Sequence, residues 1–168
     1  IGSEVMITAT LAIKVFQIGY VVPDLTAATA FFKKNYAVPN FLEVRGAGLS
    51  DQTYRGGPGN CRYNIAFGYF GDLQIELIEP VSGESTYKEF LQRNPQGGAQ
   101  HIGVLVDEFD TACAELQGKG YEIVQSGRNG KTRIAYFDTD RSVGTLTELV
   151  YLDPPDRERF QRLKRGEA

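Results

Sequence analysis

The chain contains an internal duplication in which residues 17–28 and 101–112 match at a constant offset of 84. The first copy reads QIGYVVPDLTAA and the second reads HIGVLVDEFDTA. Both copies run as an apolar strand, an acidic turn and then a segment with apolar residues at helical spacing. Self-similarity of this kind predicts two copies of one supersecondary unit that pack against each other.

A second matched pair of segments ends each half. Residues 73–78 read LQIELI and residues 145–150 read TLTELV, and a proline follows each within a few residues. Each segment alternates like a strand and carries one glutamate among apolar neighbours, Glu76 in the first and Glu148 in the second. The duplication therefore relates both the first and the last strand of each half.

Each half has room for two further strands, so each half is predicted to be β-α-β-β-β and the chain α+β. The further strands are expected near residues 41–44, 63–69, 121–125 and 133–138. The expected organisation is an N-terminal extension at 1–12, a first βαβββ module at 13–81, a linker with a short helix at 82–98, a second βαβββ module at 99–152 and a C-terminal helix at 153–168. The segment 45–61 is rich in glycine and polar residues, and it reads as a long loop that could serve as a lid, although it could equally be disordered.

Charge and composition exclude several classes of protein. The formal net charge of -3 argues against a nucleic-acid partner, because neutralising phosphates requires clustered basic residues. No apolar run approaches the roughly 20 residues that span a bilayer, so no membrane segment is expected. Cys61 and Cys113 lack the spacing of a disulfide framework or a thiolate metal site. These features lead us to expect a cytoplasmic protein.

Four polar residues at equivalent strand positions form a candidate metal site: Gln17, Glu76, His101 and Glu148. Taken alone, His101 would more often be a core histidine, and each glutamate would more often face solvent. A pseudo-two-fold axis would bring all four together, and a buried carboxylate requires a cation or hydrogen bonds. A nitrogen and oxygen donor set without sulfur suits a divalent zinc, nickel, cobalt, iron or manganese ion.

The chain resembles the vicinal oxygen chelate superfamily, which includes glyoxalase I, methylmalonyl-CoA epimerase, extradiol dioxygenases and bleomycin resistance proteins. The residues that carry the resemblance are IELIEPVSGEST at 75–86, Phe90-Leu91 and GGAQH at 97–101, in addition to the duplication. They are closest in pattern to the epimerase, whereas the Gln-Glu-His-Glu set is similar to one type of glyoxalase I. The resemblance implies a cupped mixed sheet around a divalent metal held by the four residues, and it implies a homodimer.

The resemblance also implies a reaction. We expect a metal-dependent isomerase, epimerase or lyase that removes a proton α to a metal-bound carbonyl through an enolate or enediolate. Glu148 is the first candidate for the base, and Glu43 is similar in placement to an epimerase base; a surface glutamate is the ordinary alternative for Glu43. A glyoxalase I-like lactoylglutathione lyase is one alternative, although Pro80 stands where that enzyme tends to carry a glutathione-binding asparagine. A non-catalytic resistance-type binding protein is another, and the single histidine disfavours extradiol chemistry.

The substrate is expected to be a small carbonyl or acyl compound. Arg133 could pair with a carboxylate or phosphate, or it could make an ordinary cross-strand pair. Tyr136 could face the cup, and the aromatic side chains of Tyr63 and Phe67 suggest an apolar wall.

Overall fold

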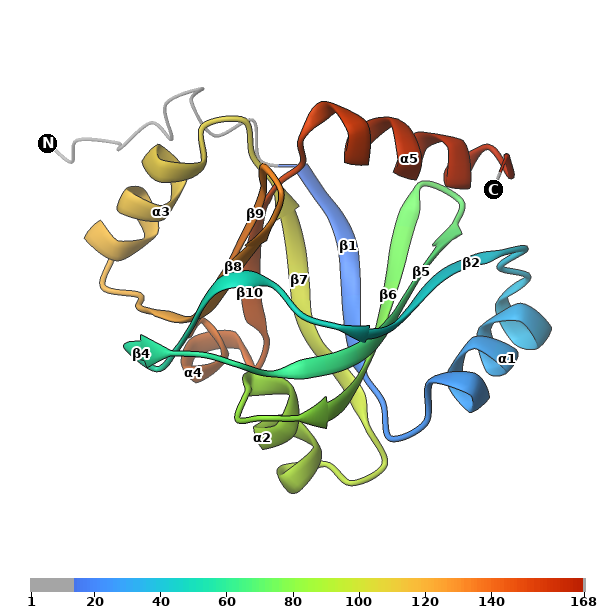
Figure 1. Cartoon of the computed structure of the whole chain (residues 1–168), viewed down its shortest axis with the longest axis horizontal. Helices are drawn as coiled ribbons and strands as arrows, with labels where there is room; N and C mark the ends of the chain where they lie inside the picture. Colours follow the sequence, from blue (N-terminus) through green and yellow to red (C-terminus); the bar gives the residue numbers. More distant parts are fainter. Residues whose placement is uncertain (1–13, 168) are drawn as a thin grey trace, which may run out of the picture.

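The computed structural model describes residues 14–167, so the N-terminal extension predicted at 1–12 lies outside the described residues. The helices and strands follow one another in the order shown in Figure 1. They are β1 (Lys14–Val21), α1 (Leu25–Tyr36), β2 (Phe41–Ala47), β3 (Ser50–Tyr54), β4 (Gly57–Pro58), β5 (Arg62–Phe70), β6 (Leu73–Ser82), α2 (Thr86–Arg93), β7 (Gly98–Leu105), α3 (Phe109–Gly118), β8 (Ile123–Asn129), β9 (Thr132–Phe137), α4 (Asp140–Val143), β10 (Leu146–Tyr151) and α5 (Pro154–Lys164).

The strands of residues 14–167 form one mixed sheet in the order β2-β5-β6-β1-β7-β10-β9-β8-β3-β4. The first strand of each half, β1 or β7, pairs in parallel with the last strand of its own half, β6 or β10. β1 and β7 pair antiparallel at the centre of the sheet, which makes the two halves mirror each other in strand order. The sheet curls strongly into a cup (Figure 1), and the predicted α+β fold of two βαβββ modules is confirmed.

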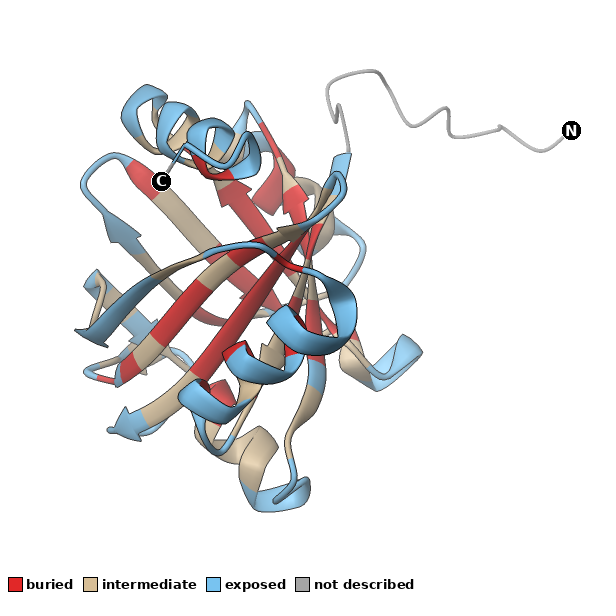
Figure 2. Ribbon diagram, turned by 90° about the vertical axis from the view of Figure 1, so that its right-hand side faces the viewer, coloured by how far each residue is buried: buried red, intermediate tan, exposed pale blue. Residues whose placement is uncertain are grey.

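Helices α1 and α3 cover the outer face of the cup. Asp24 caps α1 by accepting a hydrogen bond from the Ala27 amide, as its place before the apolar helix residues predicts. Leu25 and Phe32 of α1 then pack on the first module, and Ala112 and Cys113 of α3 pack on the second. Figure 2 shows that the helices present exposed residues outward while the strands carry most of the buried ones. The inner face of the sheet is therefore left free to line a cavity.

The segment predicted as a loop at 45–61 is largely β structure, which corrects the sequence prediction. β3 leaves β2 at one end of the sheet and pairs antiparallel with β8 at the other end, with Tyr54 opposite Gln125. Beyond β3, Arg55 binds Glu89 of α2 through two hydrogen bonds of 2.7 Å each. The prediction failed because β3, SDQTY, is half exposed and shows no apolar alternation. In this structure the segment is therefore part of the sheet and not a long loop.

The C-terminal helix α5 lies across the open side of the cup (Figure 1). Asp153 caps its first turn, and Leu163 near its end is buried. The ring of Phe160 packs on Phe67 of β5, with 4.9 Å between centroids, so the helix reaches from the second module to the first. No helix within residues 14–167 is long and apolar enough to cross a membrane.

Candidate metal centre

The pairing of β1 with β7 brings the first-strand residues of both modules to the centre of the sheet. Gln17 lies opposite Gly103, and His101 lies opposite Gly19. This register repeats the duplication, since residue 17 corresponds to 101 and residue 19 to 103. Two first-strand polar side chains therefore project into one cup, as the duplication predicts.

The last strands add one glutamate from each module. Glu76 on β6 is next to Gly19, and Glu148 on β10 is next to Gly103. Ligand atoms of Glu76, His101 and Glu148 all lie within 4.8 Å of one another, and all three side chains are buried. The structure therefore brings together three of the four predicted ligands, and Gln17 lines the same cavity as the two glutamates.

His101 is oriented by a neighbour that the sequence prediction did not include. Its Nδ1 lies 2.9 Å from Oε1 of Gln100, an oxygen that can only accept. Burial lowers the pKa of His101, so the imidazole is neutral and carries its proton on Nδ1. Nε2 then presents a lone pair to the carboxylates of Glu76 at 2.9 Å and Glu148 at 3.5 Å. This tautomer is the one a metal ligand requires.

The carboxylates are placed where ionisation is costly without a cation. Burial raises the pKa of Glu76 to about 8, and burial followed by the charge of Glu76 raises the pKa of Glu148 to about 8. A protonated Glu76 can donate to Nε2 of His101, so a proton takes the place of a cation between them. A cation that binds here would therefore displace the protons of Glu76 and Glu148.

Two buried oxygens lack a hydrogen-bond partner among the described residues: Oε1 of Gln17 and Oε2 of Glu148. The Gln17 amide is fixed because its Nε2 donates to Gln74 at 2.7 Å, and Gln74 in turn donates to the Tyr69 hydroxyl at 2.9 Å. The Gln17 oxygen points at Gly103, where an added Cβ would meet it at 2.4 Å. Unpartnered oxygens beside a histidine lone pair are the donors that a divalent cation binds, so the residues fit the predicted metal.

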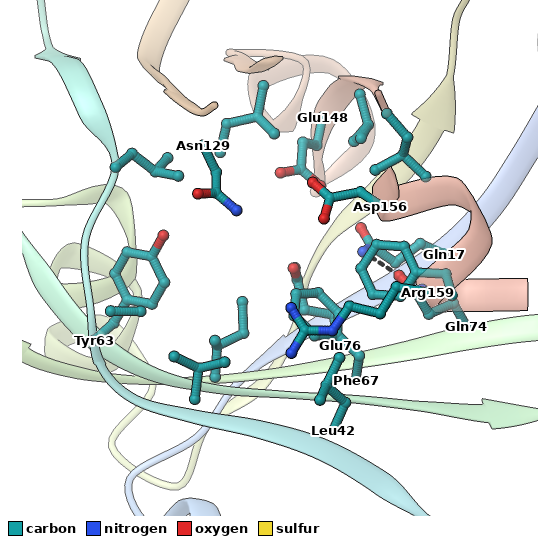
Figure 3. A pocket seen from close by; sticks show the side chains of 18 of the residues that line it. Gln17, Leu42, Tyr63, Phe67, Gln74, Glu76, Asn129, Glu148, Asp156 and Arg159 are labelled. Carbon is teal, nitrogen blue, oxygen red and sulfur yellow. Dashed lines mark hydrogen bonds between the residues drawn. The ribbon is translucent and has the colours of Figure 1, made fainter. Parts of the chain in front are cut away.

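The cluster opens into a cavity of about 270 Å³ on the inner face of the sheet. Tyr63 and Phe67 line it (Figure 3), and so does Tyr136. Tyr136 also packs edge-on against the His101 ring at 5.1 Å and accepts a hydrogen bond from the Tyr87 hydroxyl at 2.9 Å. The cavity walls are mainly apolar and aromatic, and the polar lining residues include Gln17, Glu76 and Glu148 of the candidate metal site.

The structure does not bring Glu43 into the cavity. Leu42 and Val44 line it, and because side chains alternate along a strand Glu43 points to the opposite face. Glu43 lies opposite Ala66, which packs in the core beneath α1, and its carboxylate pairs with Arg45 at 3.1 Å. The sequence could place Glu43 on a strand but could not tell which face of that strand would line the cavity.

Arg133 also lies outside the cavity. Ile134 lines the cavity, whereas Arg133 pairs with Asp110 of α3 at 2.8 Å and lies over the Phe109 ring at 4.3 Å. Its guanidinium therefore ties α3 to β9 on the outer face.

Sequence reasoning missed the contribution of α5 to the site. Asp156, Arg159 and Phe160 line the cavity, at the i, i+3 and i+4 spacing of one helix face. The charged residues of this helix resembled a solvated surface, and only the single aromatic Phe160 indicated a packed face. Asn129, at the end of β8, was also missed.

Comparisons with known proteins agree with this architecture. Residues 16–137 match the family model of the Glyoxalase/Bleomycin resistance protein/Dioxygenase superfamily. The chain is 31% identical over 137 residues to the mitochondrial methylmalonyl-CoA epimerase of Homo sapiens, which covers 79% of this chain and 70% of that protein.

Two solved structures share the fold. Methylmalonyl-CoA epimerase from Mycobacterium tuberculosis superposes with a TM-score of 0.61 at 20% identity, covering 92% of this chain and 97% of that one. A methylmalonyl-CoA epimerase in complex with methylmalonyl-CoA and NH4+ gives 0.58 at 22% identity, covering 84% and 96%. The duplicated modules, the site on their central strands and these likenesses agree: the chain belongs to the glyoxalase, bleomycin resistance protein and dioxygenase superfamily.

Proposed function

We propose that the protein is a divalent-metal-dependent epimerase of an acyl thioester that carries an acidic proton on the carbon next to the thioester carbonyl. The observation that carries the proposal is the buried cluster of Glu76, His101 and Glu148, two of which line a cavity of about 270 Å³. The likeness to methylmalonyl-CoA epimerases supports it and suggests methylmalonyl-CoA as the first substrate to test.

Gln17, Glu76, His101 and Glu148 would hold the metal, with Gln100 orienting the histidine. A bound divalent cation supplies Lewis-acid stabilisation of the negative charge that develops on a substrate oxygen when the neighbouring carbon loses its proton. The donor set is compatible with zinc, nickel, cobalt, iron or manganese.

Glu148 is the group that we propose removes the proton. Its carboxylate lines the cavity, and Oε2 has no partner among the described residues. Burial raises its pKa to about 8 in the metal-free protein, and a bound cation would lower that pKa again, so Glu148 would act as the base in its deprotonated carboxylate form. The aromatic rings of Tyr63 and Phe67 line the same cavity and give it an apolar wall. Epimerisation is complete when water gives a proton to the opposite face of that carbon and Glu148 releases the proton it took to solvent.

The two alternative functions are less well supported. A lactoylglutathione lyase is not favoured, because the sequence relatives reported above are epimerases. A resistance-type binding protein would not need two buried carboxylates and an unpartnered buried amide oxygen at the centre of its sheet.

Two copies of the chain are expected to associate in solution; a sedimentation mass equal to one chain would contradict this expectation.

The proposal is tested by stripping the protein with a chelator, reloading it with each metal and incubating it with a single epimer of methylmalonyl-CoA in deuterated water. NMR should show deuterium at the acidic carbon and loss of stereochemical purity, both dependent on metal. Glu148→Gln should reduce the rate by at least about 100-fold, as loss of a general base does. Glu115→Gln is the matched control, since Glu115 pairs with Lys119 on α3. Absence of exchange with every metal would refute the proposal.

A further inference from the structure

Helix α5 holds one arginine over the metal centre. Arg159 lines the same cavity as Glu76 and Glu148, and Figure 3 shows its side chain extending from the helix into that cavity. The family match ends at residue 137, so α5 lies beyond the part of the chain that the superfamily model describes.

The helix is anchored on both sides of Arg159, so the position of the arginine is defined. On one side the Thr132 hydroxyl of β9 donates to Asp156 at 2.6 Å. On the other side Phe160 packs on Phe67, and Lys164 pairs with Asp72 at the turn between β5 and β6. These contacts join the second module to the first across the cup and leave the Arg159 side chain above the cavity.

The charges around the cavity are unequal. Among residues 14–167, Arg159 is the only arginine or lysine that lines it, against the carboxylates of Glu76, Glu148 and Asp156. A divalent cation would offset the two glutamates, and Asp156 already accepts the hydrogen bond from Thr132. Arg159 makes no hydrogen bond or ion pair within the described part of the chain. Its guanidinium is therefore available to an anion that enters the cavity.

We propose that Arg159 is a specificity-determining residue that binds an ionised carboxyl group on the acyl part of the substrate. The planar fork of a guanidinium matches a carboxylate through two parallel hydrogen bonds. The phosphates of a coenzyme A thioester are separated from its acyl group by the pantetheine arm, whereas Arg159 shares its cavity with the proton-abstracting Glu148. The inference rests on the proposed function and deepens it: it assigns recognition of the second carboxyl group of the acyl chain to Arg159 of α5.

The test compares Arg159→Gln and Arg159→Lys with the control Arg162→Gln. Arg162 lies one turn further along α5, does not line the cavity and faces Glu167. Metal-loaded proteins are titrated calorimetrically with malonyl-CoA, propionyl-CoA and coenzyme A. Arg159→Gln should weaken malonyl-CoA binding by about 10-fold to 100-fold, the effect of losing charged hydrogen bonds, and should leave the other two ligands unchanged. The affinity of Arg159→Lys for malonyl-CoA should lie between those of the wild type and Arg159→Gln. The affinity of Arg162→Gln should equal that of the wild type.

An equal loss of affinity for all three ligands would overturn the inference and assign Arg159 to a phosphate. Unchanged malonyl-CoA binding would also overturn it. This test is independent of the proposed reaction, because it measures ligand affinity and not epimerisation. If the wild type fails to epimerise methylmalonyl-CoA yet binds malonyl-CoA through Arg159, the reaction is wrong and the role of Arg159 stands.

Discussion

Gly19 lies directly opposite His101 in the antiparallel pair of β1 and β7, and a Cβ atom on Gly19 would lie 1.8 Å from Cε1 of the imidazole. The imidazole thus occupies the space that any other residue at position 19 would fill. The same relationship recurs between Gly103 and Gln17 in the other half. Each first-strand ligand depends on a glycine from the opposite module.

Replacing Gly19 by alanine should displace His101 and weaken metal binding. The collision is with a ring that packs against Tyr136, so little relaxation is available. We expect a loss of about 1–3 kcal/mol in the free energy of unfolding, measured by urea denaturation, together with a lower metal content. Gly118→Ala is the control, since nothing lies within 4 Å of a Cβ there. A Gly19→Ala protein with wild-type stability and metal content would show that the ring can move freely.

Adding a divalent metal should stabilise the stripped protein, because the cation binds the folded cluster and relieves its buried carboxylates. At a metal concentration 100 times the dissociation constant the gain is about 2.7 kcal/mol. Calorimetric scans should show a higher melting temperature that a chelator reverses. His101→Ala should abolish the shift, and Glu115→Gln should retain it. A melting temperature that no metal raises would count against the site.

Gln100 should be needed for metal affinity although it is not itself a ligand. Gln100→Leu removes the acceptor at Nδ1 of His101 and allows the other tautomer, which points a proton at the metal position. Affinity should fall by about 10-fold to 100-fold in a metal titration, as for other partners of metal-bound histidines. Gln100→Glu keeps an acceptor oxygen and should recover most of the affinity. Equal losses in both variants would point to a packing role.

Glu43→Gln should leave turnover nearly unchanged, whereas Glu148→Gln should lose it. The reason is the strand alternation that turns Glu43 toward α1 and Arg45. The measurement is deuterium exchange into methylmalonyl-CoA by each variant under identical metal loading. A large loss in Glu43→Gln would mean that β2 presents its other face to the substrate during the reaction.

The contact between β3–β4 and α2 should weaken in acid. Hydrogen bonds from Arg55 hold the pKa of Glu89 below its ordinary value of 4.5. A lowered folded-state pKa stabilises the protein above the unfolded value, and this contribution is lost as the pH falls through the folded value. The wild type should exceed Glu89→Gln in stability by about 1 kcal/mol or less at pH 7. The difference should begin to fall near pH 4.5 and should vanish only below the lowered folded-state pKa of Glu89. Urea denaturation across that range, with amide exchange in β3, provides the check; a constant difference would exclude the ion pair as its cause.

The duplication made the two modules and the convergence of Glu76, His101 and Glu148 predictable, because it marked equivalent strand positions that single residues could not. The register that places Gln17 and His101 beside each other follows from that symmetry. The faces of β2 and β9 were not predictable in the same way. Glu43 lies between Leu42 and Val44, and Arg133 lies between Thr132 and Ile134. In both strands the packing of α1 or α3 decides which face of the strand turns outward.

The role of α5 was beyond prediction for a different reason. Its sequence is mostly charged, so periodicity indicates a surface helix, and the direction it takes after β10 depends on tertiary contacts such as that of Phe160 with Phe67. β3 escaped detection because its exposed, polar residues show no apolar alternation, and its pairing with β8 of the other half could not be read from the duplication.

The pairing of β3 with β8 also bears on how far the two halves are still separable. A first module expressed alone would carry β3 with no strand to join, and a second module alone would expose the edge of β8, with its unpaired amides and carbonyls. Exposed edges of this kind promote aggregation and strand exchange between molecules. The two halves are still related by symmetry, but neither can complete its sheet without the other. Dividing this chain between β6 and β7 should therefore yield fragments that are soluble only when they are produced together.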